Sequence, residues 1–94
     1  MNAAALRKRL TQSLIDEIND VQFPSVTMMN RVEAALGTRD ELADYAEALV
    51  RKVEATRYPS ISLLNRVDGL LDRLEQFERV QQLQAAQGDG AQGD

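Results

Sequence analysis

Residues 22–36 read QFPSVTMMNRVEAAL and residues 57–71 read RYPSISLLNRVDGLL, so one segment occurs twice, 35 residues apart. Proline, serine, asparagine, arginine, valine and the final leucine are identical in the two copies, and most other pairs are chemically similar. Upstream the match weakens but keeps an apolar pattern, in which Leu14, Ile15 and Ile18 correspond to Leu49, Val50 and Val53. The chain is therefore predicted to use one unit twice, over residues about 2–36 and 38–71. Each unit is a long helix, a turn containing proline and a second helix.

This duplication predicts an all-α fold. The spacing resembles the roughly 34 residues of tetratricopeptide units, which stack as helical hairpins, but the tryptophan and the other marker positions of that family are absent. Stacked hairpins also need about three or more copies to bury their apolar faces. We therefore expect the two tandem hairpins to close on each other as a four-helix bundle. This single domain would cover residues 1–87, with the last helix reaching about residue 86 and a flexible, disordered acidic tail at 88–94.

The first helix is predicted from about Asn2 to Asp20. Its basic residues lie in its first half and its acids near its end, which opposes the helix macrodipole, so packing or a partner must stabilise it. In Phe23-Pro24-Ser25 and Tyr58-Pro59-Ser60, proline ends one helix and serine caps the next. Each aromatic side chain is expected to close one end of the hairpin core. The apolar stripe of the first helix is Leu6, Leu10, Leu14, Ile18 and Val21.

The centre of the chain carries the next helix boundary. Gly37 is expected to take the left-handed conformation that follows many helices, and Thr38 and Glu41 have the spacing of a capping box. The third helix should begin at about Arg39, with Leu42, Tyr45, Leu49, Val53 and Thr56 as its apolar stripe. The last helix has the widest apolar face, which needs two neighbours to cover it. That face comprises Leu63, Leu64, Val67, Leu70, Leu71, Leu74 and Phe77.

Composition excludes several functional classes. The 94 residues include 15 acids and 11 bases, for a net charge of −4, and neither cysteine nor histidine. Their absence removes disulfides, sulfur-ligated zinc sites and Ser-His catalysis. No segment has the pattern of a secretory signal, and none approaches the ~20 apolar residues that span a bilayer. We therefore expect an unprocessed, soluble cytoplasmic protein that is not an enzyme and has no cofactor and no metal.

One side of the second helix in each unit repeats the same polar and small residue types at the same spacing. In the first unit it comprises Thr27, Asn30, Arg31 and Ala34; in the second, Ser62, Asn65, Arg66 and Gly69. The small residues permit close approach of a helix, and asparagine and arginine supply directional hydrogen bonds. These eight residues are the predicted partner-binding residues.

Two interpretations of this Asn-Arg face stay open, a structural one and a binding one. If Arg31 pairs with the antiparallel first helix, the residue opposite it is near Asp16. The corresponding residue in the second unit is Arg51, so the same salt bridge cannot form twice, although Arg66 could still reach Asp16. In the binding interpretation, the chain is a protein-interaction, adaptor or regulatory subunit that docks a helical partner or a second copy of itself.

One alternative function is that of a small nucleic-acid-binding transcriptional regulator, which the negative net charge disfavours. Another is a structural assembly protein that forms an oligomer through the leucines of the last helix.

Overall fold

The computed structural model describes the backbone of residues 2–92 and the side chains of residues 2–85. Within these limits the fold is all-α, with four helices and no strand, as predicted: α1 (Ala3–Asp20), α2 (Val26–Ala35), α3 (Arg39–Ala55) and α4 (Ile61–Gln92). The backbone of α4 thus continues beyond residue 86. The predicted tail at 88–94 falls outside the residues whose side chains are described, and residues 93–94 lie outside the described chain altogether.

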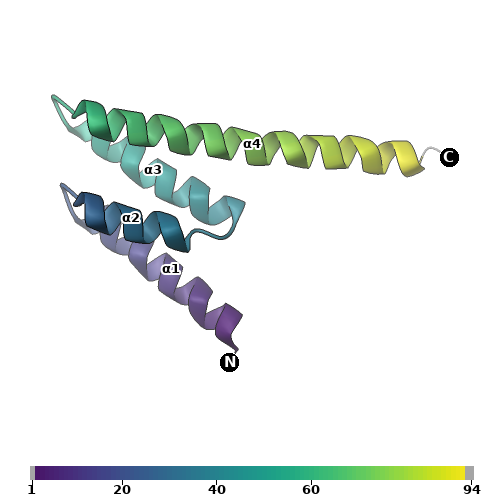
Figure 1. The fold of residues 1–94 in the computed structure, drawn as a ribbon, viewed down its shortest axis with the longest axis horizontal. Coiled ribbons are helices and arrows are strands. Elements are labelled where there is room, and N and C mark those ends of the chain that lie inside the picture. The colour runs from purple at the N-terminus through teal and green to yellow at the C-terminus, as the bar shows by residue number, and fades with distance from the viewer. Residues whose placement is uncertain (1, 93–94) are drawn as a thin grey trace.

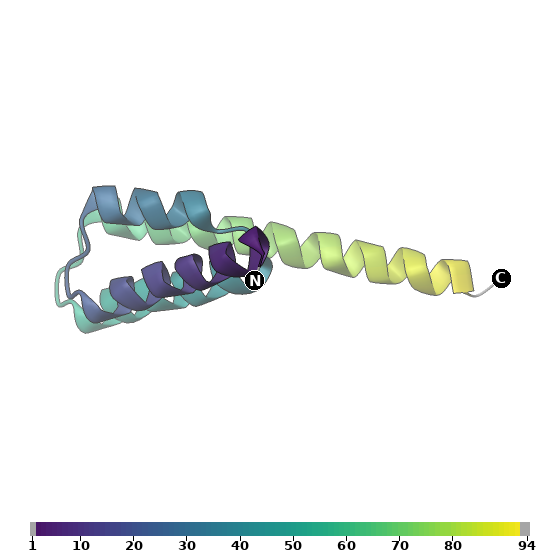
Figure 2. The same ribbon diagram turned by 90° about the horizontal axis from the view of Figure 1, so that it is seen from below.

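The four helices form two antiparallel hairpins, α1 with α2 and α3 with α4, that lie side by side (Figure 1). Figure 2 shows two layers, with α1 and α3 in one layer and α2 and α4 in the other. The main contacts join α3 to α4, α1 to α3 and α1 to α2. The packing is compact, but the hairpins stack in the same direction rather than closing around one axis. The stack therefore has two open ends, one at the α1/α2 hairpin and one at the α3/α4 hairpin.

The core lies between the two layers. The predicted stripe of α3 is confirmed at its centre, because Leu42, Tyr45 and Leu49 are at most 1% exposed. Val32 of α2 and Ile18 of α1 are fully buried beside them. Burial of such side chains is the main favourable contribution to folding, at roughly 1.5–3 kcal/mol for each large one.

The stripe predicted for α1 is wrong in its first half. Leu6 and Leu10 are 50% and 49% exposed, whereas Thr11 is buried with Ile15. The cause is the direction of α1, whose N-terminal turns lie away from α2 (Figure 1). Thr11 is the first buried residue of α1, and its hydroxyl lies within hydrogen-bond distance of the carbonyls of Arg7 and, at 3.4 Å, Ala35.

The two turns that contain proline begin the second helix of each hairpin. As predicted, Ser25 and Ser60 cap these helices, each Oγ accepting a hydrogen bond from the amide three residues later, at 3.1 and 3.0 Å. The prediction that the preceding aromatic residues close the core is wrong, since Phe23 is 70% and Tyr58 81% exposed. Both lie beyond the helix ends, where they line a hollow of about 410 Å³ between the two turns.

The α2–α3 turn contains the predicted capping box. The Thr38 hydroxyl accepts from the Glu41 amide, and the Glu41 carboxylate accepts from the amides of Thr38 at 3.2 Å and Gly37 at 2.9 Å. The left-handed conformation expected at Gly37 is not adopted, because no glycine in the described chain has a positive φ. The Glu41 carboxylate satisfies the amides of the turn, so the chain enters α3 without a left-handed residue.

A lysine of α3 compensates for the unfavourable charges of α1, which has no acid in its first turn and no base in its last. Lys52 Nζ donates to the carbonyl oxygens of Asn19, at 3.2 Å, and Val21, at 2.5 Å. A cation at this position interacts favourably with the negative end of the helix macrodipole. The neighbouring hairpin thus supplies the charge that the sequence of α1 lacks.

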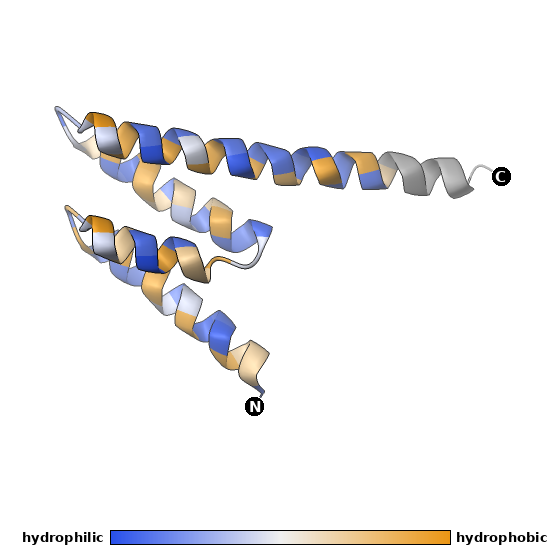
Figure 3. Ribbon diagram, viewed as in Figure 1, coloured by the Kyte–Doolittle hydropathy of each residue, from blue (hydrophilic) through white to orange (hydrophobic). Residues whose placement is uncertain are grey.

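The second half of α4 extends beyond the other three helices (Figure 1). Within the stack of hairpins Val67 and Leu70 are buried, but Leu64 and Leu71 are 39% and 36% exposed, so one side of the wide apolar face is uncovered. Figure 3 shows apolar residues continuing along the projecting part, where the exposed ones are Phe77, Val80 and Leu83. None of the helices over residues 2–92 is long and apolar enough to cross a membrane.

Candidate protein-binding groove between α2 and α4

The four candidate residues of the second unit line one groove of about 450 Å³ between α2 and α4. Ser62, Asn65, Arg66 and Gly69 all contribute to it, together with Glu33, Leu70 and Arg73. They come together because residues three and four apart lie on the same side of a helix. At Gly69 an added Cβ atom would meet nothing within 4 Å, so the groove is open at this point.

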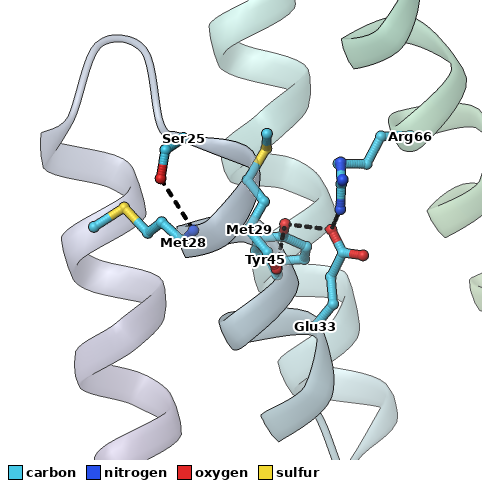
Figure 4. A network of polar contacts seen from close by, with 6 residues as sticks. All are labelled: Ser25, Met28, Met29, Glu33, Tyr45 and Arg66. Carbon is cyan, nitrogen blue, oxygen red and sulfur yellow. Dashed lines mark hydrogen bonds and ion pairs between the residues drawn. The ribbon is translucent and has the colours of Figure 1, made fainter.

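One wall of the groove is held by a polar network that joins three helices (Figure 4). Arg66 of α4 donates to Glu33 Oε2 of α2 at 2.5 Å, and the Tyr45 hydroxyl of α3 donates to the same oxygen at 2.7 Å. The carbonyl oxygen of Met29 lies 3.4 Å from that hydroxyl. The side chains of Arg66 and Glu33 are 18% and 22% exposed, so this ion pair is largely shielded from water.

Burial and the network extend to higher pH the range over which Tyr45 stays protonated. Burial of the phenol raises the pKa of Tyr45 far above its usual value of 10.0, and the hydrogen bond to Glu33 raises this pKa further. Both effects favour the neutral form, because the phenolate would lose its hydration and face a carboxylate. At neutral pH this side chain is a hydrogen-bond donor that positions Glu33. In the described part of the chain, no group of three or more acidic side chains is placed to hold a metal ion.

Arg66 has a structural partner, but not the one considered from the sequence. It pairs with Glu33 on the neighbouring second helix rather than with Asp16 of α1, whose carboxylate accepts from Gln12 Nε2 at 3.0 Å. The reason is the stacking of the hairpins, which places α4 alongside α2. Among the predicted binding residues of α4, Ser62, Asn65 and Gly69 are exposed and Arg66 is partly buried.

The four candidate residues of the first unit lie at the open α1/α2 end of the stack. All four are exposed side chains of α2: Thr27, Asn30, Arg31 and Ala34. The two copies of the Asn-Arg face thus lie on α2 and α4, which are neighbours in one layer, and do not form one site (Figure 2). Only the copy on α4 has a neighbouring helix that turns the face into a groove.

Several residues of the groove were not predicted. Glu33 and Arg73 carry charge into it, and a second hollow of about 290 Å³ follows along α4, lined by Arg73, Gln76, Phe77 and Val80. Arg73 lines both hollows, so they adjoin each other. The repeated spacing of an arginine and an acid two residues later, as in Arg31 and Glu33, is the signal that could have indicated the ion pair.

Comparison with known proteins adds no relative from which a function could be transferred. No protein-family model, no curated protein and no solved structure matches this chain.

Proposed function

We propose that the chain is a non-enzymatic protein-interaction module, an adaptor or regulatory subunit, that binds a helix of a partner protein between α2 and α4. The observation that carries this proposal is the groove itself, which is open at Gly69, is lined by hydroxyl and amide side chains and has an apolar continuation on α4. A cysteine-free chain suits the cytoplasm, which we propose as its location.

The scaffold for this function is, in our proposal, one 35-residue hairpin used twice. The ends of α1 and α3, at Asp20 and Ala55, are 35 residues apart, and so are the starts of α2 and α4, at Val26 and Ile61. Both second helices also begin with the same serine cap. These coincidences support a duplicated unit, since each pair of boundaries has the spacing of the sequence repeat.

The residues along α4 suit an amphipathic helix as the partner. Ser62 and Asn65 can exchange hydrogen bonds with its polar side, and the open space at Gly69 allows its backbone to approach closely. Phe77 and Val80, 42% and 51% exposed, can contact apolar side chains on successive turns of the partner helix. Such helix-in-groove binding is a common mode of peptide recognition.

Nucleic-acid binding is the second candidate, and the groove favours it less. Binding of this type depends on cations that neutralise phosphates. Arg66 is already paired with Glu33, so of the two repeated arginines only Arg31 is an exposed cation. Retention of duplex DNA that decreases steeply with salt would support this alternative.

The test is to block the groove with a bulky side chain. Gly69→Trp places an indole in space that is open, so the fold should be kept, and we expect loss of a partner captured from a lysate of the source cell. Asp44→Trp, on the exposed side of α3, is the matched control and should capture the same partner as the unaltered chain. Equal capture by both variants, or no protein partner for the unaltered chain, would contradict the proposal.

A further inference from the structure

The open α3/α4 end of the stack repeats a surface that the α1/α2 hairpin buries inside the molecule. Ile15, Ile18, Met29 and Val32 of the first hairpin are all at most 6% exposed, within the core between the hairpins. The residues 35 positions later, Val50, Val53, Leu64 and Val67, line an open hollow of about 380 Å³. The apolar surface is thus fully covered at the first hairpin, whereas at the second Leu64 is 39% exposed and Val50 and Val53 are only partly buried.

The charged groups of the internal interface recur at the two open ends. Inside the molecule Glu33 binds Arg66. The residue that corresponds to Glu33 is Asp68, exposed in the open hollow of the α3/α4 end, and the residue that corresponds to Arg66 is Arg31, exposed on α2. Neither forms an ion pair with another side chain among residues 2–85. The α3/α4 end therefore has an acid without an arginine partner, and the α1/α2 end has an arginine without an acidic partner.

We propose that a second copy of this chain stacks head to tail on the first. The α1/α2 end of one copy covers the α3/α4 end of the other, and Arg31 pairs with Asp68 between copies as Arg66 pairs with Glu33 within one. Leu10 corresponds to Tyr45, which contacts Glu33 across the internal interface. The Leu10 side chain is 49% exposed. It would cover Leu64 of the neighbouring copy. This goes beyond the proposed function, because the contact uses the ends of the stack rather than the groove between α2 and α4, with which the open hollow shares Asn65.

Contact between copies is weaker than the internal interface, because two internal interactions have no equivalent. Leu10 lacks the hydroxyl by which Tyr45 binds Glu33. Glu17 stands where Lys52 binds the last carbonyls of α1, so it would place a like charge at the negative end of the neighbouring α3. Association is therefore reversible and rises with concentration. Because the contact is heterologous, it does not close at two copies.

Reciprocal charge changes test this geometry. Molar mass is measured by light scattering over a concentration series at low salt, since exposed ion pairs are screened by salt. We expect the mass of the unaltered chain to rise past two copies, and Arg31→Glu and Asp68→Arg each to remain single, because like charges then meet. An equimolar mixture of the two variants should regain association, since each end again meets an opposite charge. Asp72→Arg, exposed on α4 and not lining the hollow, carries the same charge change as Asp68→Arg and should associate normally.

A gain-of-association variant keeps the test decisive. Glu17→Lys installs the equivalent of Lys52 and should raise the mass at every concentration. The proposal is overturned if both the unaltered chain and Glu17→Lys keep the mass of one chain, or if the mass stops at two copies and only Asp68→Arg reduces it, which indicates a symmetric tail-to-tail dimer. Gly69→Trp should self-associate normally, so a failure of stacking and a failure of groove binding are distinguishable.

Discussion

Replacing Glu33 by alanine should destabilise the fold more than any other single change of an acidic residue on α2 or α4. Glu33 Oε2 accepts from both Tyr45 and Arg66, so the variant removes the acceptor of two hydrogen bonds at once. The phenol is left buried without its partner, and the guanidinium is left without its counter-charge. The expected result is a lower free energy of unfolding with the helical fold kept.

The magnitude follows from how far these groups are shielded. Loss of a hydrogen bond to a charged group costs roughly 1.5–3 kcal/mol, and removing one partner of a fully buried ion pair costs roughly 3–5 kcal/mol. The Arg66 side chain is 18% exposed, so its guanidinium can recover part of its hydration. We therefore expect a loss of about 2–3 kcal/mol, which for a domain of this size lowers Tm by roughly 10–20 °C.

Urea unfolding followed by circular dichroism measures this difference, at a concentration where the chain is a single copy. Asp68→Ala is the matched control, because Asp68 corresponds to Glu33 in the repeat but is exposed on α4. Its unfolding free energy should change by no more than about 0.5 kcal/mol. Equal effects of the two substitutions would refute the reasoning, because the shared carboxylate oxygen would then contribute nothing specific.

Two further predictions concern side chains that join the hairpins. Lys52→Met removes the cation at the end of α1 and should cost about 1–2 kcal/mol, with faster hydrogen exchange in the last turn of α1; unchanged exchange there would contradict it. The pKa of Tyr45 is higher in the folded chain than its value of 10.0 in the unfolded chain. The contribution of Tyr45 to the free energy of unfolding is therefore complete below pH 10 and decreases by about 1.4 kcal/mol per pH unit as the pH rises from there towards the folded pKa. Urea midpoints measured from pH 9 to pH 11 should therefore fall more steeply for the unaltered chain than for Tyr45→Phe, and parallel curves would count against this.

Local features were predictable because they depend on neighbouring residues. The serine caps and the box formed by Thr38 and Glu41 follow from side chains that reach amides three residues away. The starts of the helices that these residues cap, α2, α3 and α4, follow for the same reason. The conformation of Gly37 was not predictable, because the Glu41 carboxylate already accepts from the amides of the turn. Spacing alone does not reveal whether a helix ends with a left-handed glycine or with such a side-chain acceptor.

Features that depend on how the hairpins pack were not predictable from periodicity. Leu6 and Leu10 continue the apolar spacing of α1, yet both are about half exposed, because the N-terminal turns of α1 lie away from α2 (Figure 1). The ion pair of Arg66 required knowing that α2 and α4 are neighbours in one layer. The groove was predicted only in part, since its α4 residues share a helix face, whereas Glu33 comes from another helix.

The projecting half of α4 also affects how the single chain elutes in gel filtration. The radius of gyration is 16.2 Å, against about 12 Å for a compact domain of this length. An elongated particle has a higher friction coefficient than a sphere of equal mass, so one chain will elute from a gel-filtration column ahead of globular standards of its own mass. Elution volume alone would therefore make a monomer resemble a dimer, and assembly must be judged from scattered light or sedimentation equilibrium.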